Sequence, residues 1–324
     1  MSINTIEIPT DNKTQFLQET LAGLQSEPKF MLSKYFYDAD GDRIFQQIMN
    51  MDEYYLTNAE MEILQNQSAQ LSQAISADGT AFDLIELGAG DATKSIHLLK
   101  SLLDAQMEFS YFPIDISEHV IADLEENLPE KLPSLDIAGL NGDYFDMLKK
   151  ATEISRRRKV VLFMGANIGN MTVIDAENFC HSLKQLLSPN DLLIIGFDLK
   201  KNPQQILNAY NDKGGITRSF NLNLLRRINK ELDGDFNIDQ FEHYASYDPA
   251  SGACKSYLIS LQNQIVNIGR NVIHFAENEY IYMEISQKYS LEDINQLATK
   301  TGFKPLQSFF DHKHYFVDAI WRVG

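Results

Sequence analysis

The sequence contains few cysteines and no long hydrophobic run. Only Cys180 and Cys254 occur among 324 residues, and neither is part of a CxxC pair. These counts favour neither a disulfide framework nor a thiolate metal site, so we expect no bound metal and interpret Cys180 as a core residue. No segment approaches ~18 uninterrupted apolar residues, and Met1–Lys13 has neither a basic nor an apolar region. We therefore expect a cytoplasmic protein with no membrane partner.

Positive charge is also scarce. The chain has 28 Lys and Arg against 45 Asp and Glu, a formal net charge of −17. Such a charge repels phosphate backbones. The main basic run, Arg156–Lys159, is short and leads directly into an apolar segment, as expected for the solvated start of a strand. We do not expect nucleic acid as a partner.

The pattern from residue 82 onward predicts βαβ units and a parallel sheet, because short apolar runs alternate with amphipathic stretches. The hydrophobic fraction of 44% and the charged fraction of 23% are ordinary for a globular protein with a large core. The expected strands are 82–87, 109–115, 136–140, 159–164 and 191–197. Helices are expected at 92–104, 117–128 and 175–187.

The rhythm changes after Asp198. After this point we expect helices 203–211 and 217–232, a hairpin of strands 241–247 and 255–261, and a strand 279–286. A helix 290–301 and a final strand pair, 304–310 and 314–321, should follow. The sequence thus predicts a doubly wound, Rossmann-like α/β core of 62–200 plus 288–324. An α+β domain, 1–61 plus 201–287, interrupts it. A ligand is expected outside the carboxyl ends of the parallel strands.

The stretch Glu86-Leu-Gly-Ala-Gly90 follows the first expected strand. A dinucleotide fingerprint needs a third glycine where this chain has Thr93, and no GxxxxGK[ST] loop is present. An acid before two glycines suits a ligand with a positive centre and no phosphate. The stretch resembles the first motif of class I S-adenosylmethionine-dependent methyltransferases, in which glycines let the chain pass close to the cofactor.

Acidic residues follow the next two expected strands. Asp115 ends the second strand, and such folds direct this carboxylate at the ribose hydroxyls. Asp143 and Tyr144 follow the weak third strand, where the acid can accept from the adenine amine and the ring can lie on the base. The alternative is that these acids only cap helices and turns. Acids at successive strand ends favour the ligand interpretation.

The segment after the fourth strand argues against a nucleobase substrate. Enzymes that methylate exocyclic amines of bases typically carry Asn/Asp-Pro-Pro-Tyr there, whereas this chain has Gly165-Ala-Asn-Ile-Gly-Asn170. Methyl transfer from a sulfonium requires mainly that a lone pair be positioned and water excluded.

An ordered set of short motifs, from about residue 30 to 290, narrows the resemblance. Together they look like the histidine-specific Nα-methyltransferase family of ergothioneine biosynthesis. The motifs are Tyr37-Asp-Ala-Asp-Gly41, Glu53-Tyr-Tyr-Leu-Thr57, Glu86-Leu-Gly-Ala-Gly90 with Lys94, Gly165-Ala-Asn-Ile-Gly-Asn170, Ala209-Tyr-Asn-Asp212, Phe220-Asn-Leu-Asn-Leu-Leu225, Asn229-Lys-Glu-Leu-Asp233 and Glu284-Ile-Ser-Gln-Lys288.

The resemblance implies trimethylation of the α-amino group of free L-histidine to hercynine, with S-adenosylmethionine as co-substrate. We expect the protein to be a monomer. The resemblance also implies that the catalytic residue Tyr37 lies close to the reacting nitrogen. The cofactor-binding residues would be Gly88, Lys94, Asp115, Asp143 and Tyr144. The substrate-binding residues would be Tyr54, Asn170 and Tyr210 at the amino-acid end, and Glu284 and Ser286 at the imidazole.

The residue types at 284 and 286 fit this role. Alternation along a strand directs Glu284 and Ser286 to one face, so an acceptor and a hydroxyl can reach both imidazole nitrogens. The alternative is an exposed strand face beside buried Met283 and Ile285.

The chain departs from the family wording at two places. Many members read Gly-Ser-Thr-Ile where this chain has Gly165-Ala-Asn-Ile, and the family uses Met near the position of Ser256. A smaller residue there would widen the pocket, so another amino acid or a small aromatic amine is the alternative substrate.

Two other classes stay open. A catalytically inactive ligand-binding homologue would have no need of Asp115, Asn170, Tyr210 and Glu284. A metal-dependent hydrolase would have to use Asp311-His-Lys-His314, whose spacing puts both histidines on one face of a strand; a hydrogen-bonded surface pair is the commoner reading.

Overall fold

The structure, a computed structural model, describes residues 12–324. The chain folds into two compact units. Unit 1 takes in the chain through Tyr54 together with Asn202–Ile285, and unit 2 comprises Tyr55–Lys201 with Ser286–Gly324. The chain therefore passes between the units at three places. The limits predicted from the sequence, 62–200 plus 288–324 and 1–61 plus 201–287, stay a prediction, and residues 1–11 lie outside the described residues.

Unit 2 alternates strands and helices, as the sequence predicts. Its elements are α3 (Tyr55–Ile75), β2 (Phe82–Leu87), α4 (Ile96–Asp104), β3 (Phe109–Asp115), α5 (Glu118–Lys131), β4 (Leu140–Asn141), α6 (Tyr144–Ile154), β5 (Arg158–Phe163), the 3-10 helix η2 (Asn167–Asn170), α7 (Val173–Leu186), β6 (Leu192–Asp198), α10 (Leu291–Lys300), β12 (Phe303–Phe310) and β13 (Phe316–Val323).

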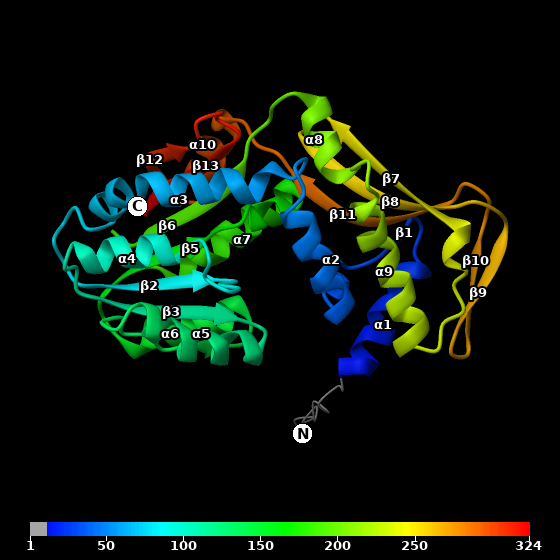
Figure 1. Ribbon diagram of the computed structural model, residues 1–324, viewed down its shortest axis with the longest axis horizontal. Helices are drawn as coiled ribbons and strands as arrows, with labels where there is room; N and C mark the ends of the chain where they lie inside the picture. Colours follow the sequence, from blue (N-terminus) through cyan, green and yellow to red (C-terminus); the bar gives the residue numbers. More distant parts are fainter. Residues whose placement is uncertain (1–11) are drawn as a thin grey trace, which may run out of the picture. The chain divides into compact units, whose positions relative to one another are not determined.

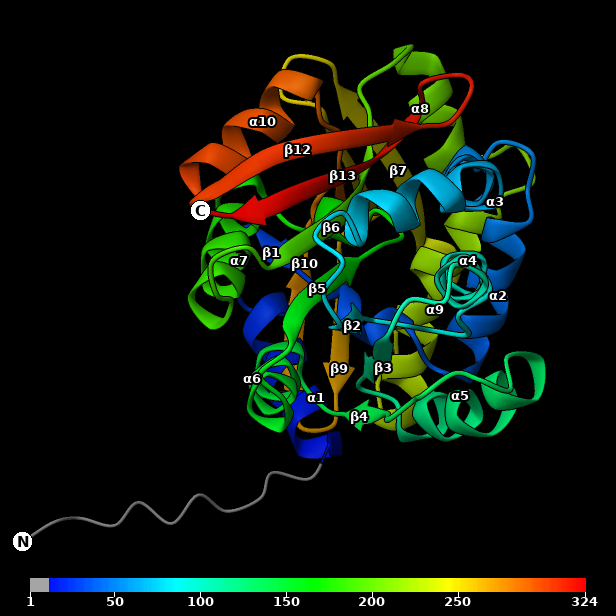
Figure 2. The ribbon, with the colours of Figure 1, turned by 90° about the vertical axis from the view of Figure 1, so that its left-hand side faces the viewer.

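One seven-stranded sheet forms the centre of unit 2, with the strand order β12-β13-β6-β5-β2-β3-β4. Strands β4, β3, β2, β5 and β6 are parallel, and β13 is antiparallel to both β6 and β12. Figure 2 shows α6, α7 and α10 on one side of the sheet and α3, α4 and α5 on the other. The doubly wound α/β fold predicted from the sequence is confirmed.

Burial on both faces explains the composition of the central strands. Every residue of β2 and of β6 is buried. Strands covered on both faces need near-continuous apolar runs, and the segment 192–197 supplies one in β6. In β2 the apolar residues are interrupted by two buried acids, Asp83 and Glu86. Because parallel strands end at one edge, this edge collects the loops after β2, β3, β5 and β6.

The predicted helix 92–104 begins later in the structure, at Ile96. Residues 92–95 form turns, and Ala92 has a left-handed φ of 52°, which interrupts a regular helix. The other helices agree with the predicted ranges to within three residues at each end.

Unit 1 combines helices with small sheets (Figure 1). Its elements are α1 (Asn12–Leu24), β1 (Lys29–Phe30), η1 (Ser33–Phe36), α2 (Ala39–Met49), α8 (Pro203–Tyr210), α9 (Ile216–Glu231), η3 (Ile238–Gln240), β7 (Phe241–Asp248), β8 (Ala253–Ser260), β9 (Gln264–Ile268), β10 (Asn271–Phe275) and most of β11 (Tyr280–Gln287).

The four-stranded sheet of unit 1 has the order β1-β11-β8-β7, and β9 pairs with β10 separately. The predicted hairpin is confirmed, since β7 and β8 pair antiparallel across the turn that ends at Gly252. The β9–β10 pair was not predicted. Each of these strands has only five residues and a short alternating pattern, which is a weak signal.

Across residues 12–324, every helix is too short or too polar to span a bilayer.

Candidate functional site

The glycine loop after β2 passes close to a tyrosine at the carboxyl edge of the sheet. Gly88 has a φ of +72°, a conformation that favours glycine. A β-carbon at this position would lie 2.7 Å from the Tyr144 Oη. The backbone N–H of Gly88 donates to the carbonyl of Ile114, 2.8 Å away, which ties the loop to the end of β3. Two of the predicted cofactor residues therefore lie together.

The two predicted acids border the same loop. Asp115, the last residue of β3, accepts from the backbone N–H of Ser117 at 2.9 Å and of Gly90 at 3.4 Å. Asp143 caps α6 by accepting from the Phe145 N–H at 2.9 Å. The capping role considered from the sequence is thus real, but a carboxylate has about four acceptor sites and can still bind a ligand.

The electrostatics place these acids beside Tyr144. Burial raises the pKa of the Tyr144 phenol, and the negative charges of Asp115 and Asp143 raise it further. Gly88, Asp115, Asp143 and Tyr144 therefore form one group, which we call the β3 rim.

Lys94, the fifth predicted cofactor residue, lies in a different polar cluster. Its ammonium pairs with the carboxylate of Glu60, a fully buried residue of α3. The other oxygen of Glu60 accepts from the backbone N–H of Gly165 at 2.6 Å. Burial lowers the pKa of Lys94, but the charge of Glu60 outweighs it and the net shift is upward. Lys94 is thus a firmly charged ammonium at the end of β5.

Two more buried carboxyls lie near this ammonium. Burial raises the pKa of Glu86 to about 7, although hydrogen bonds from Tyr111 and Ser95 oppose the shift. Burial and the charge of Glu60 raise the pKa of Asp318 well above its usual range. Neither oxygen of Asp318 has a hydrogen-bond partner within residues 12–324.

The predicted substrate residues of unit 1 are aromatic apart from Glu284. Tyr54 meets Tyr210 edge to face, with the ring centroids 6.2 Å apart. The ring of Tyr37 packs edgewise on Phe45 and Phe220 and is 46% exposed. Glu284 lies half-buried on β11. The structure brings Tyr54 and Tyr210 together within this unit.

The predicted substrate residues of unit 2 are Asn170, at the end of η2, and Ser286, on β11. Asn170 is exposed at the end of η2, and the preceding Gly169 abuts β11, where a β-carbon would lie 3.0 Å from the Gln287 carbonyl oxygen. The same β-carbon would lie 3.8 Å from the Ser286 Oγ. The Oγ of Ser286 accepts from the Lys288 ammonium at 2.7 Å. Asn170 and Ser286 therefore belong to neighbouring segments.

Lys288 belongs to a buried ionic cluster that the sequence did not predict as a site. Its ammonium lies 2.6 Å from Asp198 Oδ2, and the Lys201 ammonium pairs with Oδ1 of the same carboxylate. The Tyr55 hydroxyl donates to Asp198 at 2.9 Å. We call these four residues, Tyr55, Asp198, Lys201 and Lys288, the Asp198 cluster.

Sequence reasoning missed Glu60, Asp318 and Asp198 as residues of interest. A charged residue inside an apolar strand was the available signal for Asp318 and for Asp198, the last residue of β6. Glu60 offered no such signal, because an acid on a long helix is usually solvated.

The histidine pair near the C-terminus lies in the turn between β12 and β13, so the expectation that a strand holds both is wrong. His312 bonds to Glu62 through Nδ1 at 2.6 Å, whereas His314 stacks on Phe310. Glu62, Asp311 and His312 offer ligand atoms within 4.8 Å of one another. The carboxylate of Asp311, however, accepts from the backbone N–H groups of Lys313, Tyr315 and Phe316.

Ser256 is 1% exposed in β8 and pairs with Ala245 of β7. It therefore belongs to the buried sheet of unit 1.

Comparison with known proteins identifies the family to which the chain is similar. The family described as "Histidine-specific methyltransferase, SAM-dependent" matches residues 16–323. Histidine N-alpha-methyltransferase of Mycolicibacterium smegmatis is 32% identical over 95% of this chain and 92% of its own length. Ergothioneine biosynthesis protein 1 of Neurospora crassa is 30% identical over 87% of this chain, which spans 32% of that protein.

Among solved structures, an S-adenosylmethionine-dependent methyltransferase from Clostridium acetobutylicum has a TM-score of 0.45 and 12% identity, and the match covers 87% of this chain and 96% of that one. From the match over nearly its whole length, the chain belongs to the histidine-specific, S-adenosylmethionine-dependent methyltransferase family.

Proposed function

We propose that the protein trimethylates the α-amino group of free L-histidine to hercynine, a step of ergothioneine biosynthesis. The observation that carries this proposal is the family match over residues 16–323 together with the β3 rim on the sheet of unit 2. The relatives named for histidine N-alpha-methylation and for ergothioneine biosynthesis support the substrate and the pathway.

The residues of the β3 rim fit the co-substrate S-adenosylmethionine. Gly88 gives the close approach that a side chain would block, because a β-carbon there would meet Tyr144. Asp115 would accept from the ribose hydroxyls and Asp143 from the adenine amine, with the Tyr144 ring against the base. The ammonium of Lys94 has three donors, of which Glu60 engages one, so it can also bind the co-substrate.

S-adenosylmethionine, when bound, supplies an electrophilic methyl group on a sulfonium. The chain's task is then to hold an amine lone pair in line with that methyl and to exclude water. Each transfer forms an N–C bond and breaks the C–S bond, and the amine loses a proton to solvent before it can accept the next methyl.

Histidine would be held by residues of two kinds. Tyr54, Asn170 and Tyr210 offer hydroxyl and amide groups for the α-carboxylate and the amine side. Glu284 and Ser286 offer an acceptor and a hydroxyl for the two imidazole nitrogens. A site that hydrogen-bonds a substrate group can reject an analogue lacking that group by about 10⁴-fold.

Tyr37 would orient the reacting nitrogen without opposing its positive charge. A phenol hydroxyl is neutral at working pH, and aromatic faces attract a methylated ammonium. The ring is fixed by Phe45 and Phe220, which supports an orienting role. We expect Tyr37→Phe to slow the second and third methylations more than it weakens histidine binding. If Tyr37→Phe has the same rate as wild type at each of the three methylation steps, that role is removed.

The experiment that tests the function is incubation with labelled S-adenosylmethionine and each free amino acid in turn, followed by mass analysis. Histidine should gain one, two and then three methyl groups. Labelling of a different amino acid or an aromatic amine alone would overturn the substrate, and labelling of nothing would favour an inactive homologue.

A matched pair of variants sharpens this test. Asp115→Ala should raise the KM for S-adenosylmethionine strongly. Asp136→Ala, which removes an exposed acid that bonds Ser110 at 2.6 Å near the other end of β3, should leave this KM unchanged.

A further inference from the structure

We propose that Asp198 and Lys288 are positioning residues for the methyl transfer. Asp198 would hold together the three places where the chain enters or leaves unit 2, and Lys288 would fix the hydroxyl of Ser286. The second part rests on the proposed function, since it takes Ser286 as a residue that binds the substrate.

The first observation is where the partners of Asp198 lie in the chain. The chain passes between the units at Tyr54/Tyr55, at Lys201/Asn202 and at Ile285/Ser286. Tyr55 and Lys201 are the unit 2 residues at the first two junctions, and Lys288 lies two residues beyond the third. All three side chains bind the Asp198 carboxylate, Tyr55 through a hydrogen bond and the two lysines through ion pairs.

The backbone at the end of β6 reinforces the third junction. The N–H of Tyr289 donates to the carbonyl of Asp198 at 3.0 Å, and the N–H of Lys200 donates to the carbonyl of Tyr289 at 2.9 Å. The chain after Asp198 and the chain after Lys288 therefore run side by side as a short parallel bridge.

The burial and charge of the cluster distinguish it from an ordinary ion pair. The side chains of Asp198, Lys201 and Lys288 are 1%, 6% and 0% exposed. Two ammonium groups thus share one carboxylate, with the Tyr55 hydroxyl as a neutral partner. Buried ammonium groups are costly to desolvate, and both of these depend on the same carboxylate for their counter-charge.

Lys288 connects this cluster to the proposed substrate site. An ammonium has donors only, so in the 2.7 Å bond the Oγ of Ser286 is the acceptor. The hydroxyl hydrogen of Ser286 is therefore directed to an acceptor elsewhere. In the substrate complex, we assign that acceptor to a ring nitrogen of the amino-acid side chain.

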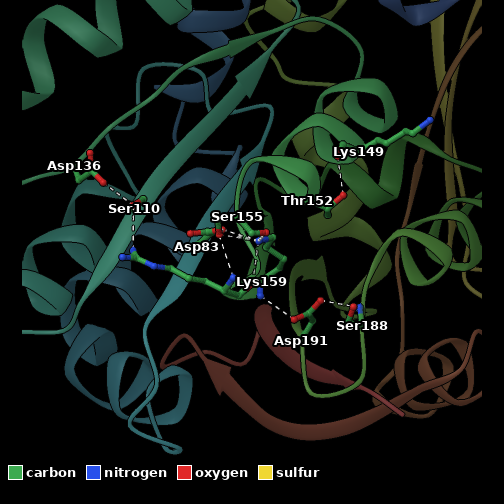
Figure 3. Close-up of polar contacts among 10 residues, drawn as sticks. Asp83, Ser110, Asp136, Lys149, Thr152, Ser155, Lys159, Ser188 and Asp191 are labelled. Atoms are coloured by element: carbon green, nitrogen blue, oxygen red, sulfur yellow. Dashed lines mark hydrogen bonds and ion pairs between the residues drawn. The ribbon is translucent and has the colours of Figure 1, made fainter.

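The test compares Lys288→Met with a variant at another buried aspartate–lysine pair. Lys288→Met leaves the Lys201 ammonium on Asp198, so one positive and one negative charge remain in the folded cluster. Figure 3 shows the control pair, Asp83 and Lys159, 2.6 Å apart at the amino end of the same sheet. Lys159→Met removes an equally buried ammonium from that pair.

We expect Lys288→Met to change the KM for histidine much more than the KM for S-adenosylmethionine. In Lys288→Met the KM for histidine rises about tenfold or more, the effect of losing a hydrogen bond from a charged donor, while the KM for S-adenosylmethionine changes less than about twofold. Tyr55→Phe, which keeps every charge, raises the histidine KM to a smaller extent. Lys159→Met lowers stability but leaves both KM values unchanged. Equal changes in both KM values, or the same histidine KM in Lys288→Met as in wild type, would overturn the role for Lys288.

A second measurement needs no substrate. In Asp198→Asn, hydrogen exchange of the free enzyme should rise together in the segments 54–56, 199–202 and 285–289. In Lys288→Met it should rise mainly in 285–289, because Tyr55 and Lys201 still bond Asp198, and Lys159→Met should leave all three segments unchanged. A rise confined to 285–289 in Asp198→Asn would end the idea that one carboxylate holds all three junctions. If wild-type enzyme fails to methylate histidine, the proposed function falls while the exchange result still decides this part.

Discussion

Two buried aspartate–lysine clusters lie at opposite ends of the strands of one sheet, and they differ in what they join. The Asp83 cluster, made of Asp83, Ser155 and Lys159, connects the starts of β2 and β5. The Lys159 ammonium also donates to the backbone carbonyls of Ser155 and Arg157, at 2.8 and 2.9 Å. One cation and one anion are thus balanced and satisfied, mostly by residues close in sequence (Figure 3).

The Asp198 cluster joins residues that lie far apart in the chain, at positions 55, 198, 201 and 288. It also holds one more cation than anions. Burial alone therefore does not distinguish a structural ion pair from a functional one. The two clusters differ instead in the path of the chain between the partners and in the balance of charge.

The largest expected effect comes from removing each carboxylate. Asp83→Ala leaves one buried ammonium without its partner, which should cost about 3–5 kcal/mol of the free energy of unfolding. Asp198→Ala leaves two buried ammonium groups without their carboxylate, so it should lower the free energy of unfolding more than Asp83→Ala does. Urea denaturation of both variants measures the difference. Equal losses would mean that the second cation at Asp198 is not held by the carboxylate.

The next effect is a dependence on pH that belongs to the Asp198 cluster. Burial lowers the pKa of Lys201 to about 8 from 10.5; Asp198 and Asp311 oppose this shift and Lys288 adds to it. The rings of Tyr55 and Tyr315 also face this ammonium. Between about pH 8 and 10.5 the unfolded chain therefore binds more protons at this site than the folded chain, so stability at this site rises with pH.

Lys201→Met removes this titration. The free energy of unfolding of wild type, relative to Lys201→Met, should therefore increase by roughly 3 kcal/mol as pH rises from 7.5 to 10.5. Denaturation curves of both proteins across that range supply the measurement, and the variant cancels titrations that the two proteins share. A constant difference would show that Lys201 keeps its ordinary pKa.

The sequence predicts one kind of feature well and the other poorly. The β3 rim could be anticipated, because Gly88, Asp115 and Asp143 each lie at the end of a parallel strand or just after it, and such strands end at one edge. The apolar residues of β2, which are interrupted by Asp83 and Glu86, and the apolar run of β6 located those strands to within a residue. These are local patterns, readable without knowledge of the chain's path.

Clusters between distant residues leave no such pattern. Tyr55, Asp198 and Lys288 are separated by at least 90 positions, and only the folded path brings them together. Glu60 and Lys94 likewise lie 34 positions apart. The residues proposed to bind the two substrates were inferred from a family resemblance, whereas those proposed to position them could be identified only from the three-dimensional structure.

A smaller effect separates the clusters through one hydroxyl in each. Tyr55 donates to Asp198 and accepts from Lys201 at 2.8 Å, and Ser155 donates to Asp83 and accepts from Lys159 at 3.3 Å. Tyr55→Phe and Ser155→Ala should each cost about 1.5–3 kcal/mol, since each removes hydrogen bonds to charged groups. Thermal denaturation should rank them alike, but steady-state kinetics should show a higher histidine KM only in Tyr55→Phe. A raised histidine KM in Ser155→Ala would erase the distinction between the two ends of the sheet.

The smallest effect is expected when both members of the balanced pair are replaced by apolar residues. Asp83→Leu with Lys159→Met removes a buried anion and a buried cation together, and such exchanges are often close to neutral. We expect the free energy of unfolding to stay within about 1 kcal/mol of wild type, with kinetics unchanged. The equivalent exchange at the other end, Asp198→Leu with Lys288→Met, leaves the Lys201 ammonium buried beside no carboxylate within the cluster. That double variant should lose both stability and histidine binding. If the two double variants lose the same free energy of unfolding in urea denaturation, the extra cation of the Asp198 cluster has no energetic consequence. The two clusters would then differ only in how far apart their partners lie along the chain.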